Sequence, residues 1–368
     1  MTLDKKISLA KEIRSLVTAH PIWQGMSPFP FILYDENNQV AVGENFPPRF
    51  TKTDENIWVA EGADPLLLGN TATKYHNQLV AIWDTRTWDA AVNHLSAATG
   101  LAHEMFHCHQ LQSMSLSWAN ELLFPQYPHT PRTVALVMEE NTTLAKILEN
   151  PKTGLSQLIA LRNMRKTETP PEFLEFDKQD ETIEGTATYV EQRLLSRLKN
   201  VPLQALLQPK VQLLIQDENV PANYRHRLYT VGAALCFAAS ALYPNWEQEW
   251  ETSGLTLYDW LEAKHGSAES VIAFPSQNME KAARQLEAFE QEKQRHIDAF
   301  MELSHTGVDG DVQILSFDPM NLVCAGGKCL HKHGLLRING EDTMLDHSFV
   351  VEYGESILDV RRLYMPTV

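Results

Sequence analysis

The spacing of apolar and polar residues divides the chain into regions of different character. In residues 1–88, short apolar runs alternate with polar turns. Two such runs flank a polar, asparagine-containing turn in residues 29–42, which predicts a β-hairpin. Residues 57–60 and 78–84 predict two further strands, and residues 1–13 mix charged and apolar positions as an amphipathic helix does. We therefore expect a helix and a small sheet here.

From residue 89 to residue 304, apolar positions recur at three- and four-residue steps, which predicts a mainly helical region. The clearest case is 277–303, where one apolar stripe is flanked by Glu, Lys, Gln and Arg. Prolines interrupt this region, and each is expected to end or precede a helix. They are Pro125, Pro128, Pro131, Pro151, Pro170, Pro171, Pro202, Pro209, Pro221, Pro244 and Pro275.

Past residue 304 the pattern changes to short β-like runs separated by Gly, Asp and Asn, which predicts a small β module. The runs lie at 312–317, 335–338, 349–353 and 357–364. The whole chain is therefore expected to have an α+β fold. We divide it into a region over 1–304, made of 1–88 and 89–304, and a C-terminal β domain over 305–368.

One segment of the helical region carries recognisable chemistry. His103, Glu104 and His107 form the pattern H-E-x-x-H, and residues four apart share one face of a helix, so both imidazoles can bind one metal ion. Glu104 would lie beside that ion as a general base. The surrounding apolar spacing predicts a helix over 89–114, although Gly100 costs it about 1 kcal/mol. The apolar positions are Leu95, Ala98, Ala102, Met105, Phe106 and Leu111.

The predicted cofactor is one zinc ion per chain. Catalytic zinc takes three protein ligands and leaves a position for water, so a third ligand must come from elsewhere in the chain. Glu184 is the first choice because Gly185 and Ala187 beside it allow another helix to come close. The residues that stay open as alternatives are Glu181, Glu139 and Glu140. Glu181 is also a candidate for orienting a histidine ligand.

The pair of segments 103–107 and 184–189 resembles the gluzincin class of zinc metallopeptidases, whose familiar members are thermolysin-like. In that class H-E-x-x-H on one helix is completed by a glutamate on a later helix. The resemblance implies a mainly helical, metalloprotease-like catalytic domain preceded by a small sheet. It also implies that His103, His107 and Glu184 are ligands and that Glu104 is the base.

Hydrolysis also needs a hydrogen-bond donor for the oxyanion. Residues 223–234 concentrate Arg, His and Tyr just before an apolar helix. Tyr229 is the first choice as donor, followed by His226 and Arg227. We also expect one strand of the N-terminal sheet, residues 79–84, to run along the rim of the cleft and offer backbone groups to an extended ligand.

The remaining metal-capable residues have simpler interpretations. His109 is two residues beyond His107 and so lies on another face, at the surface or behind the ligands, whereas Cys108 is expected to be a small buried residue. Residues 324–333 contain two cysteines and two histidines, but their spacing fits no common zinc knuckle. A Gly-Gly turn between two strands explains this segment better than a second metal site.

Composition narrows the setting more than the function. The net charge of −16 argues against a nucleic-acid partner, because phosphates require a basic face. Neither a signal peptide nor a membrane-spanning run is predicted, so we expect a cytoplasmic protein without a membrane partner. The cysteines are too few and too irregularly spaced for a disulfide framework, which is typical of a reducing compartment or of incidental thiols. They are Cys108, Cys236, Cys324 and Cys329.

These patterns together predict a zinc-dependent hydrolase, specifically a metallopeptidase acting on a peptide or protein substrate. Two other functions stay open. One is a binding or scaffold protein that holds a metal without catalysis, and the other is a hydrolase of non-peptide amides. Glu104 favours catalysis, because a structural zinc site needs no base and usually has four protein ligands. The substrate and the oligomeric state are left open.

Overall fold

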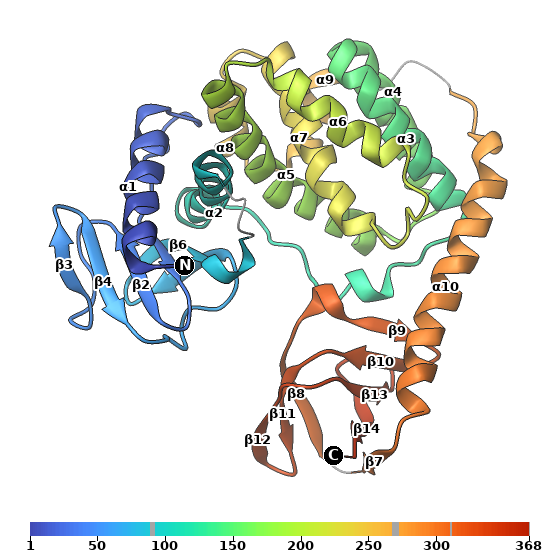
Figure 1. The fold of residues 1–368 in the computed structure, drawn as a ribbon. Helices are drawn as coiled ribbons and strands as arrows, with labels where there is room; N and C mark the ends of the chain where they lie inside the picture. The colour runs from blue at the N-terminus through green and yellow to red at the C-terminus, as the bar shows by residue number, and fades with distance from the viewer. Residues whose placement is uncertain (89–92, 267–271, 310, 368) are drawn as a thin grey trace.

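The computed structural model describes residues 1–88, 93–266, 272–309 and 311–367. The protein has an α+β fold in which an N-terminal sheet, a central group of helices and a C-terminal β module follow one another (Figure 1). The long helix α10 (Met279–Met301) runs along one side of the molecule from the helical region to the β module. In the described part of the chain, no helix combines the length and the apolar character needed to cross a membrane.

The N-terminal sheet has six strands in the order β3-β4-β2-β1-β6-β5, and β1 pairs with β6 in parallel while the other pairs are antiparallel. Side chains of β1 alternate between two apolar clusters, since Phe31 and Leu33 face the helices whereas Ile32 and Tyr34 face the opposite side. The strands are β1 (Phe31–Tyr34), β2 (Asn38–Val42), β3 (Thr51–Asp54), β4 (Ile57–Glu61), β5 (Thr71–Tyr75) and β6 (Gln78–Asp84).

The predicted hairpin and the strands at 57–60 and 78–84 are confirmed. The outermost strands β3 and β5 were not predicted, because their sequences, TKTD and TATKY, are too polar to show an apolar alternation. Helices α1 (Leu3–Ala19) and α2 (His94–Ser113) pack against the sheet and against each other. Helix α2 places the H-E-x-x-H segment against the side of the sheet formed by β5 and β6.

The predicted metal-binding helix is present as α2, and the part of the prediction at 89–92 lies outside the described residues. Asn93 begins it by accepting a hydrogen bond from the backbone of Ser96. The glycine inside the helix has a packing reason: a Cβ on Gly100 would lie 2.8 Å from the ring of Trp83 on β6. The missing side chain therefore lets the sheet and the helix come together.

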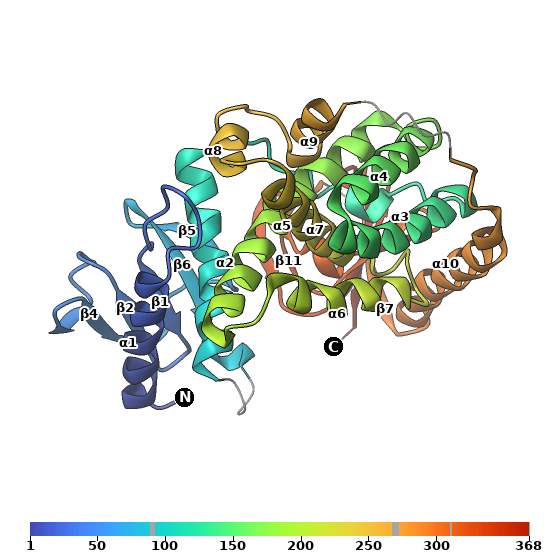
Figure 2. The ribbon, with the colours of Figure 1, turned by 90° about the horizontal axis from the view of Figure 1, so that it is seen from above.

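The helical region is centred on α5, which packs against both α2 and α7 (Figure 2). Its helices are α3 (Pro131–Glu149), α4 (Pro151–Arg165), α5 (Pro171–Lys199), α6 (Leu203–Ile215), α7 (Tyr224–Leu242), α8 (Trp246–Glu251) and α9 (Leu257–His265). Proline begins α3, α4 and α5 as expected. The expectation is wrong for Pro209, which lies inside α6 on an exposed face where water can bond the carbonyl that loses its partner.

Helices α5 and α7 cross at two glycines. A Cβ on Gly185 would overlap the backbone of Gly232, and a Cβ on Gly232 would overlap the carbonyl of Glu181. The small residue beside Glu184 does allow a close approach, but the helix that approaches is α7. The expectation that Gly185 brings Glu184 toward the histidine helix is therefore wrong, because Gly185 faces away from α2.

The C-terminal β module contains a five-stranded sheet, in the order β7-β14-β13-β10-β9, and a three-stranded sheet, β12-β11-β8. The four predicted runs correspond to β8, β11, β13 and β14, and β14 begins at residue 360. The short strands β7, β9, β10 and β12 were not predicted. The full set is β7 (His305–Val308), β8 (Val312–Phe317), β9 (Val323–Ala325), β10 (Lys328–His331), β11 (Gly334–Ile338), β12 (Glu341–Leu345), β13 (Phe349–Tyr353) and β14 (Val360–Pro366).

The segment with two cysteines and two histidines forms the β9–β10 hairpin. Gly326 and Gly327 both have positive φ angles and make its turn, which confirms the prediction. Cys324 and Cys329 face each other across the hairpin and form a disulfide. The expectation of incidental thiols is wrong for this pair, because sequence spacing did not reveal their opposed register. Cys108 and Cys236 are free and buried.

The β module also touches the segment that joins α2 to α3. Leu122 of that segment packs against the apolar cluster around the disulfide, which contains Leu322, Cys324, Cys329 and Ile357. The short turn at Phe124–Gln126 contacts β9 as well. Segments far apart in the sequence thus contact each other below the helical region in the view of Figure 1.

Candidate metal centre

Three predicted ligands come together between α2 and α5. The carboxylate oxygen Oε2 of Glu184 lies 3.4 Å from Nε2 of His103 and 3.4 Å from Nε2 of His107. All the donor atoms of this cluster lie within 4.8 Å of one another. Among the described residues it is the group of this kind that could hold a metal ion. One helical turn separates the two histidines, and the packing of α5 on α2 supplies the carboxylate.

Each histidine has a second partner. Nδ1 of His107 lies 2.7 Å from Oε1 of Gln110, and Nδ1 of His103 lies 3.7 Å from Oε2 of Glu191. Partners on the outer nitrogen fix the ring and leave Nε2 for the metal. Glu181 does not have the orienting role that the sequence suggested. It is fully buried against Arg162, with one N–O distance of 2.5 Å, and faces away from the histidines.

The electrostatics of the cluster favour a bound cation. Burial lowers the pKa of His103, but its hydrogen bonds with Glu184 and Glu191 outweigh burial and raise this pKa to about 10. Burial acts to raise the pKa of Glu184, whereas the two histidines hold it well below its usual range. The negative charges of Glu184 and Glu191 thus hold a proton on His103 when no metal is bound, and a metal ion would have to displace that proton.

Glu104 lies beside this cluster. Its side chain is buried, and this burial is the largest cause of the raised pKa of its carboxyl group. Glu104 lines a pocket of about 450 Å³ together with both histidines and Glu184. The other residues that line this pocket are Asn70, Thr71, Ala72, Leu111, Trp118 and Tyr229. The cluster is thus reached from an open pocket whose wall includes Glu104, a carboxylate that is not a member of the cluster.

The strand on the rim of the pocket is β5. Strand β6, which the sequence suggested, lies between β1 and β5 and so has partners on both sides. That expectation is wrong, because β5 is the outer strand and Thr71 and Ala72 of β5 line the pocket. An outer strand keeps backbone groups free for a further strand.

The three predicted oxyanion donors lie in different places on α7. Tyr229 lines the pocket, with its ring stacked 6.3 Å from the ring of His103. Burial and the charge of Glu184 raise the pKa of Tyr229, so its hydroxyl stays protonated. His226 is exposed, 6.3 Å beyond the ring of Tyr229, and is not among the lining residues.

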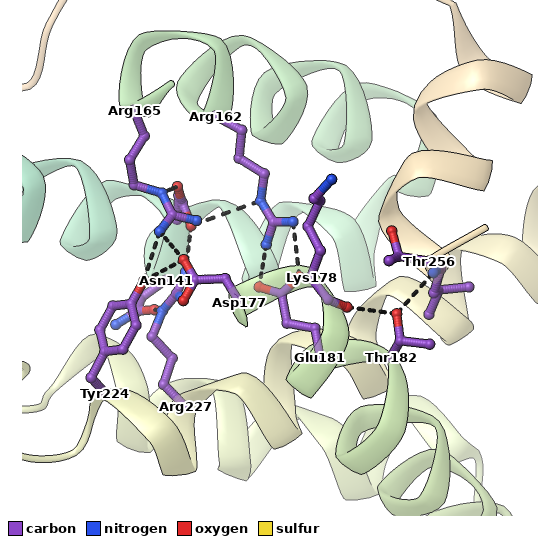
Figure 3. Close-up of polar contacts among 12 residues, drawn as sticks. Asn141, Arg162, Arg165, Asp177, Lys178, Glu181, Thr182, Tyr224, Arg227 and Thr256 are labelled. Carbon is purple, nitrogen blue, oxygen red and sulfur yellow. Dashed lines mark hydrogen bonds and ion pairs between the residues drawn. The ribbon is translucent and has the colours of Figure 1, made fainter. Parts of the chain in front are cut away.

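Arg227 does not lie at the ligand cluster, and the prediction that it is an oxyanion donor is wrong. Its side chain is buried on the opposite side of α7, where it bonds Glu140 at 2.6 Å and Asn141 at 2.6 Å (Figure 3). The apolar character of α7 on most faces hid which face each arginine occupies. Arg225, two residues earlier, is the arginine that faces the ligand cluster. Its Nη2 atom lies 3.7 Å from Oε1 of Glu184.

The alternatives for the third ligand are occupied elsewhere. Glu140 belongs to a buried network that joins α3, α4, α5 and α7, whereas Glu139 accepts a hydrogen bond of 3.5 Å from Gln277. The network pairs three guanidinium groups with three carboxylates, and Figure 3 shows its arginines between the helices. Its charged members are Arg162, Arg165 and Arg227 with Glu140, Asp177 and Glu181. It fixes α5, the helix that carries Glu184, against α3, α4 and α7.

His109 is buried and bonds Glu251 at 2.9 Å, so it is neither exposed nor directed at the ligands. Cys108 is fully buried, as predicted. The residues that sequence reasoning missed are Gln110, Glu191, Arg225 and Glu121. The helical spacing of Gln110 from His107 and of Arg225 from Tyr229, three and four residues, is the signal that could have identified two of them.

Comparison with protein-family models found no matching family, and comparisons with curated proteins and with solved structures found no significant match. The function must therefore be argued from the chemistry of this site.

Proposed function

We propose that this protein is a zinc-dependent metallopeptidase of the gluzincin type. The observation that carries the proposal is the convergence of His103, His107 and Glu184 beside an open pocket whose wall contains the unbound Glu104. Two imidazole nitrogens and a carboxylate oxygen are a ligand set that catalytic zinc uses. Zinc bound there would supply an acidified water and a positive charge near the carbonyl oxygen.

The other roles belong to side chains of the pocket. Glu104 accepts a proton from the attacking water and passes it to the nitrogen of the leaving amine. The Tyr229 hydroxyl donates a hydrogen bond to the carbonyl oxygen on which negative charge develops. Both residues line the pocket that contains the ligand cluster, so one substrate can reach them together.

The rim strand supports a peptide as the substrate. Residues 71 and 72 of β5 line the pocket, and the outer edge of this strand can pair with an extended chain. Backbone pairing would hold the scissile bond beside the ligand cluster whatever its side chains. A small non-peptide amide could use the same chemistry but not this edge, which favours peptides over the alternative hydrolase.

The competing function is a binding protein that holds zinc without catalysis. A structural zinc site closes all four positions with protein ligands, whereas this cluster has three and faces a pocket. The absence of a fourth protein ligand, judged over the described residues, favours catalysis.

The test is to measure the zinc content of the purified protein and its cleavage of a mixed peptide library. We expect about one zinc per chain and cleavage that a chelator abolishes and added zinc restores. Denatured protein is only a partial control for contaminating peptidases. The Glu104→Gln variant, purified in parallel by the same procedure, is therefore the control. Zinc-loaded protein that cleaves no peptide would support the binding function instead.

A further inference from the structure

Arg225 and the two histidines lie near different carboxylate oxygens of Glu184. Its Nη2 atom lies 3.7 Å from Oε1 of Glu184, whereas both histidine nitrogens face Oε2 at 3.4 Å. One oxygen is thus directed to the guanidinium and the other to the ligand cluster. A carboxylate held in this way presents a single oxygen to a metal ion.

The same guanidinium holds Tyr229. Nη1 of Arg225 donates a hydrogen bond of 2.9 Å to the Tyr229 hydroxyl. Because an arginine has no acceptor, the phenolic oxygen must be the acceptor here. The phenolic hydrogen is therefore left free to point elsewhere, and the open direction is the pocket that Tyr229 lines. Arg225 itself is not among the pocket-lining residues, so it acts through its neighbours.

Two acidic residues hold Arg225 in place. Glu121, from the segment between α2 and α3, bonds both Nε at 3.2 Å and Nη2 at 2.9 Å. Asp180, one turn before Glu184 on α5, lies 3.4 Å from Nη2. The Arg225 side chain is 8% exposed and that of Asp180 is 3% exposed, so water screens this pair little, whereas Glu121 is 35% exposed and its contact is screened in part. Three segments of the chain thus converge on one guanidinium.

We propose that Arg225 is a positioning residue of the metal centre, which orients Glu184 for the metal and Tyr229 for the substrate. The part that concerns Glu184 requires only that a metal binds. The part that concerns Tyr229 rests on the proposed peptidase function. A lysine at this position could keep a positive charge near Glu184, but it has no planar fork with which to hold Glu121, Glu184 and Tyr229 together.

The experiment compares Arg225→Met and Arg225→Lys with wild type. Zinc affinity is measured by competition with a chelator, and the visible spectrum of the cobalt-loaded protein reports the ligand geometry. We expect Arg225→Met to weaken zinc binding about 10- to 100-fold and to shift the cobalt spectrum. Arg225→Lys should recover part of the zinc affinity. On a cleaved peptide, both variants should lower kcat more than they raise KM, because Tyr229 acts in the transition state.

The matched control is Arg227→Lys, two residues away on the other face of α7. It should lower the melting temperature while zinc affinity and the cobalt spectrum stay as in wild type. If Arg225→Met does not fold, Glu121→Gln weakens the restraint on Arg225 and should still reduce zinc affinity several-fold. Wild-type affinity and an unchanged spectrum in folded Arg225→Met, or in Glu121→Gln where it replaces that variant, would overturn the proposal. A wild-type protein that cleaves no peptide would instead contradict the peptidase function, since the metal measurements need no substrate.

Discussion

Gln110 bonds the histidine that lies one turn before it on α2: its Oε1 atom lies 2.7 Å from Nδ1 of His107. The orientation of its amide is set from α5, because Nε2 of Gln110 donates to the carbonyl of Ile183 and to the hydroxyl of Thr186. The amide oxygen must therefore accept from His107, which places the hydrogen on Nδ1 and the lone pair on Nε2. One amide thus selects the tautomer that binds metal.

Replacing Gln110 with alanine should weaken zinc binding about 10- to 100-fold, because His107 loses the partner that fixes its ring and its tautomer. Chelator competition measures the effect. Gln112→Ala, an exposed position on the same helix, is the control and should leave zinc affinity unchanged. Equal affinities for the two variants would show that Gln110 has no influence on the metal.

Glu184 and Glu181 should separate zinc binding from stability. Glu184→Ala removes a ligand and should strongly reduce the zinc content, as should a His103→Ala, His107→Ala double variant. Glu181→Ala removes the closest ion-pair partner of the buried Arg162 and leaves it the more distant Glu140 at 4.0 Å, so it should cost about 3–5 kcal/mol of unfolding free energy and leave the zinc content near one per chain. Metal analysis and urea unfolding test both effects. Zinc loss from folded Glu181→Ala, with zinc retained in Glu184→Ala, would exchange the two assignments.

Glu104→Gln should keep zinc and lose activity. The amide has the shape of the carboxylate and leaves both histidines in place, but it cannot accept the proton of the attacking water. Removing a general base lowers turnover about 10²- to 10⁴-fold. The measurement is kcat on any peptide that wild type cleaves, together with zinc content. A variant that holds zinc and retains the wild-type rate would disprove the mechanism while leaving the metal site intact.

Glu140 should make stability depend on acid pH. Burial acts to raise its pKa, but Arg165, Arg227 and Arg162 lower it to about 2. Because this pKa lies below the value of about 4.3 in an unfolded chain, the stabilisation by ionised Glu140 is fully present above that pH. It is lost as the pH falls toward 2. Urea unfolding at pH 5 and pH 3 should therefore show Glu140→Gln less stable than wild type by an amount that narrows at pH 3. A difference independent of pH would contradict this.

Gly232→Ala should be costly because its Cβ would overlap the backbone of α5 at Glu181. Backbone cannot rotate away as a side chain can, so we expect a loss of about 3 kcal/mol or more, above the usual range for overpacking. Gly100→Ala is the contrasting variant, because its Cβ would meet only the ring of Trp83. Alanine also has a higher helix propensity than glycine, so we expect a smaller loss of stability. Thermal unfolding of both variants is the measurement. A similar small change in each would show that α5 and α7 can separate without cost.

Sequence patterns were sufficient for the elements that are rich in apolar residues. The helical spacing of apolar positions predicted α2 and α10, and short apolar runs bounded by polar turns predicted strands β1, β2, β4 and β6. The outer strand β5 has no such pattern, because a strand that is mostly exposed has no buried face to specify. The rim of the pocket was therefore assigned to its apolar neighbour β6. Exposed strands next to a site are the elements that this kind of reasoning misses.

The ligand cluster was predictable only in part. His103 and His107 share a helix, so local geometry relates them, whereas Glu184 depends on how α5 packs on α2. The sequence could not predict which of Arg225 and Arg227 lies near Glu184, for a similar reason. Both lie on α7, a helix buried on most sides, so hydrophobicity could not indicate which arginine faces the metal cluster and which faces Glu140.

The contact of Leu122 with the disulfide hairpin restricts how this protein can have evolved. Leu122 follows Glu121, the residue that holds Arg225, and it packs against the apolar cluster that contains Cys324 and Cys329. An exchange of the C-terminal β module for an unrelated one would remove the apolar surface on which Leu122 rests. A replacement would have to offer a similar surface at the same place, so the module and the segment before α3 are expected to change together among descendants of this chain.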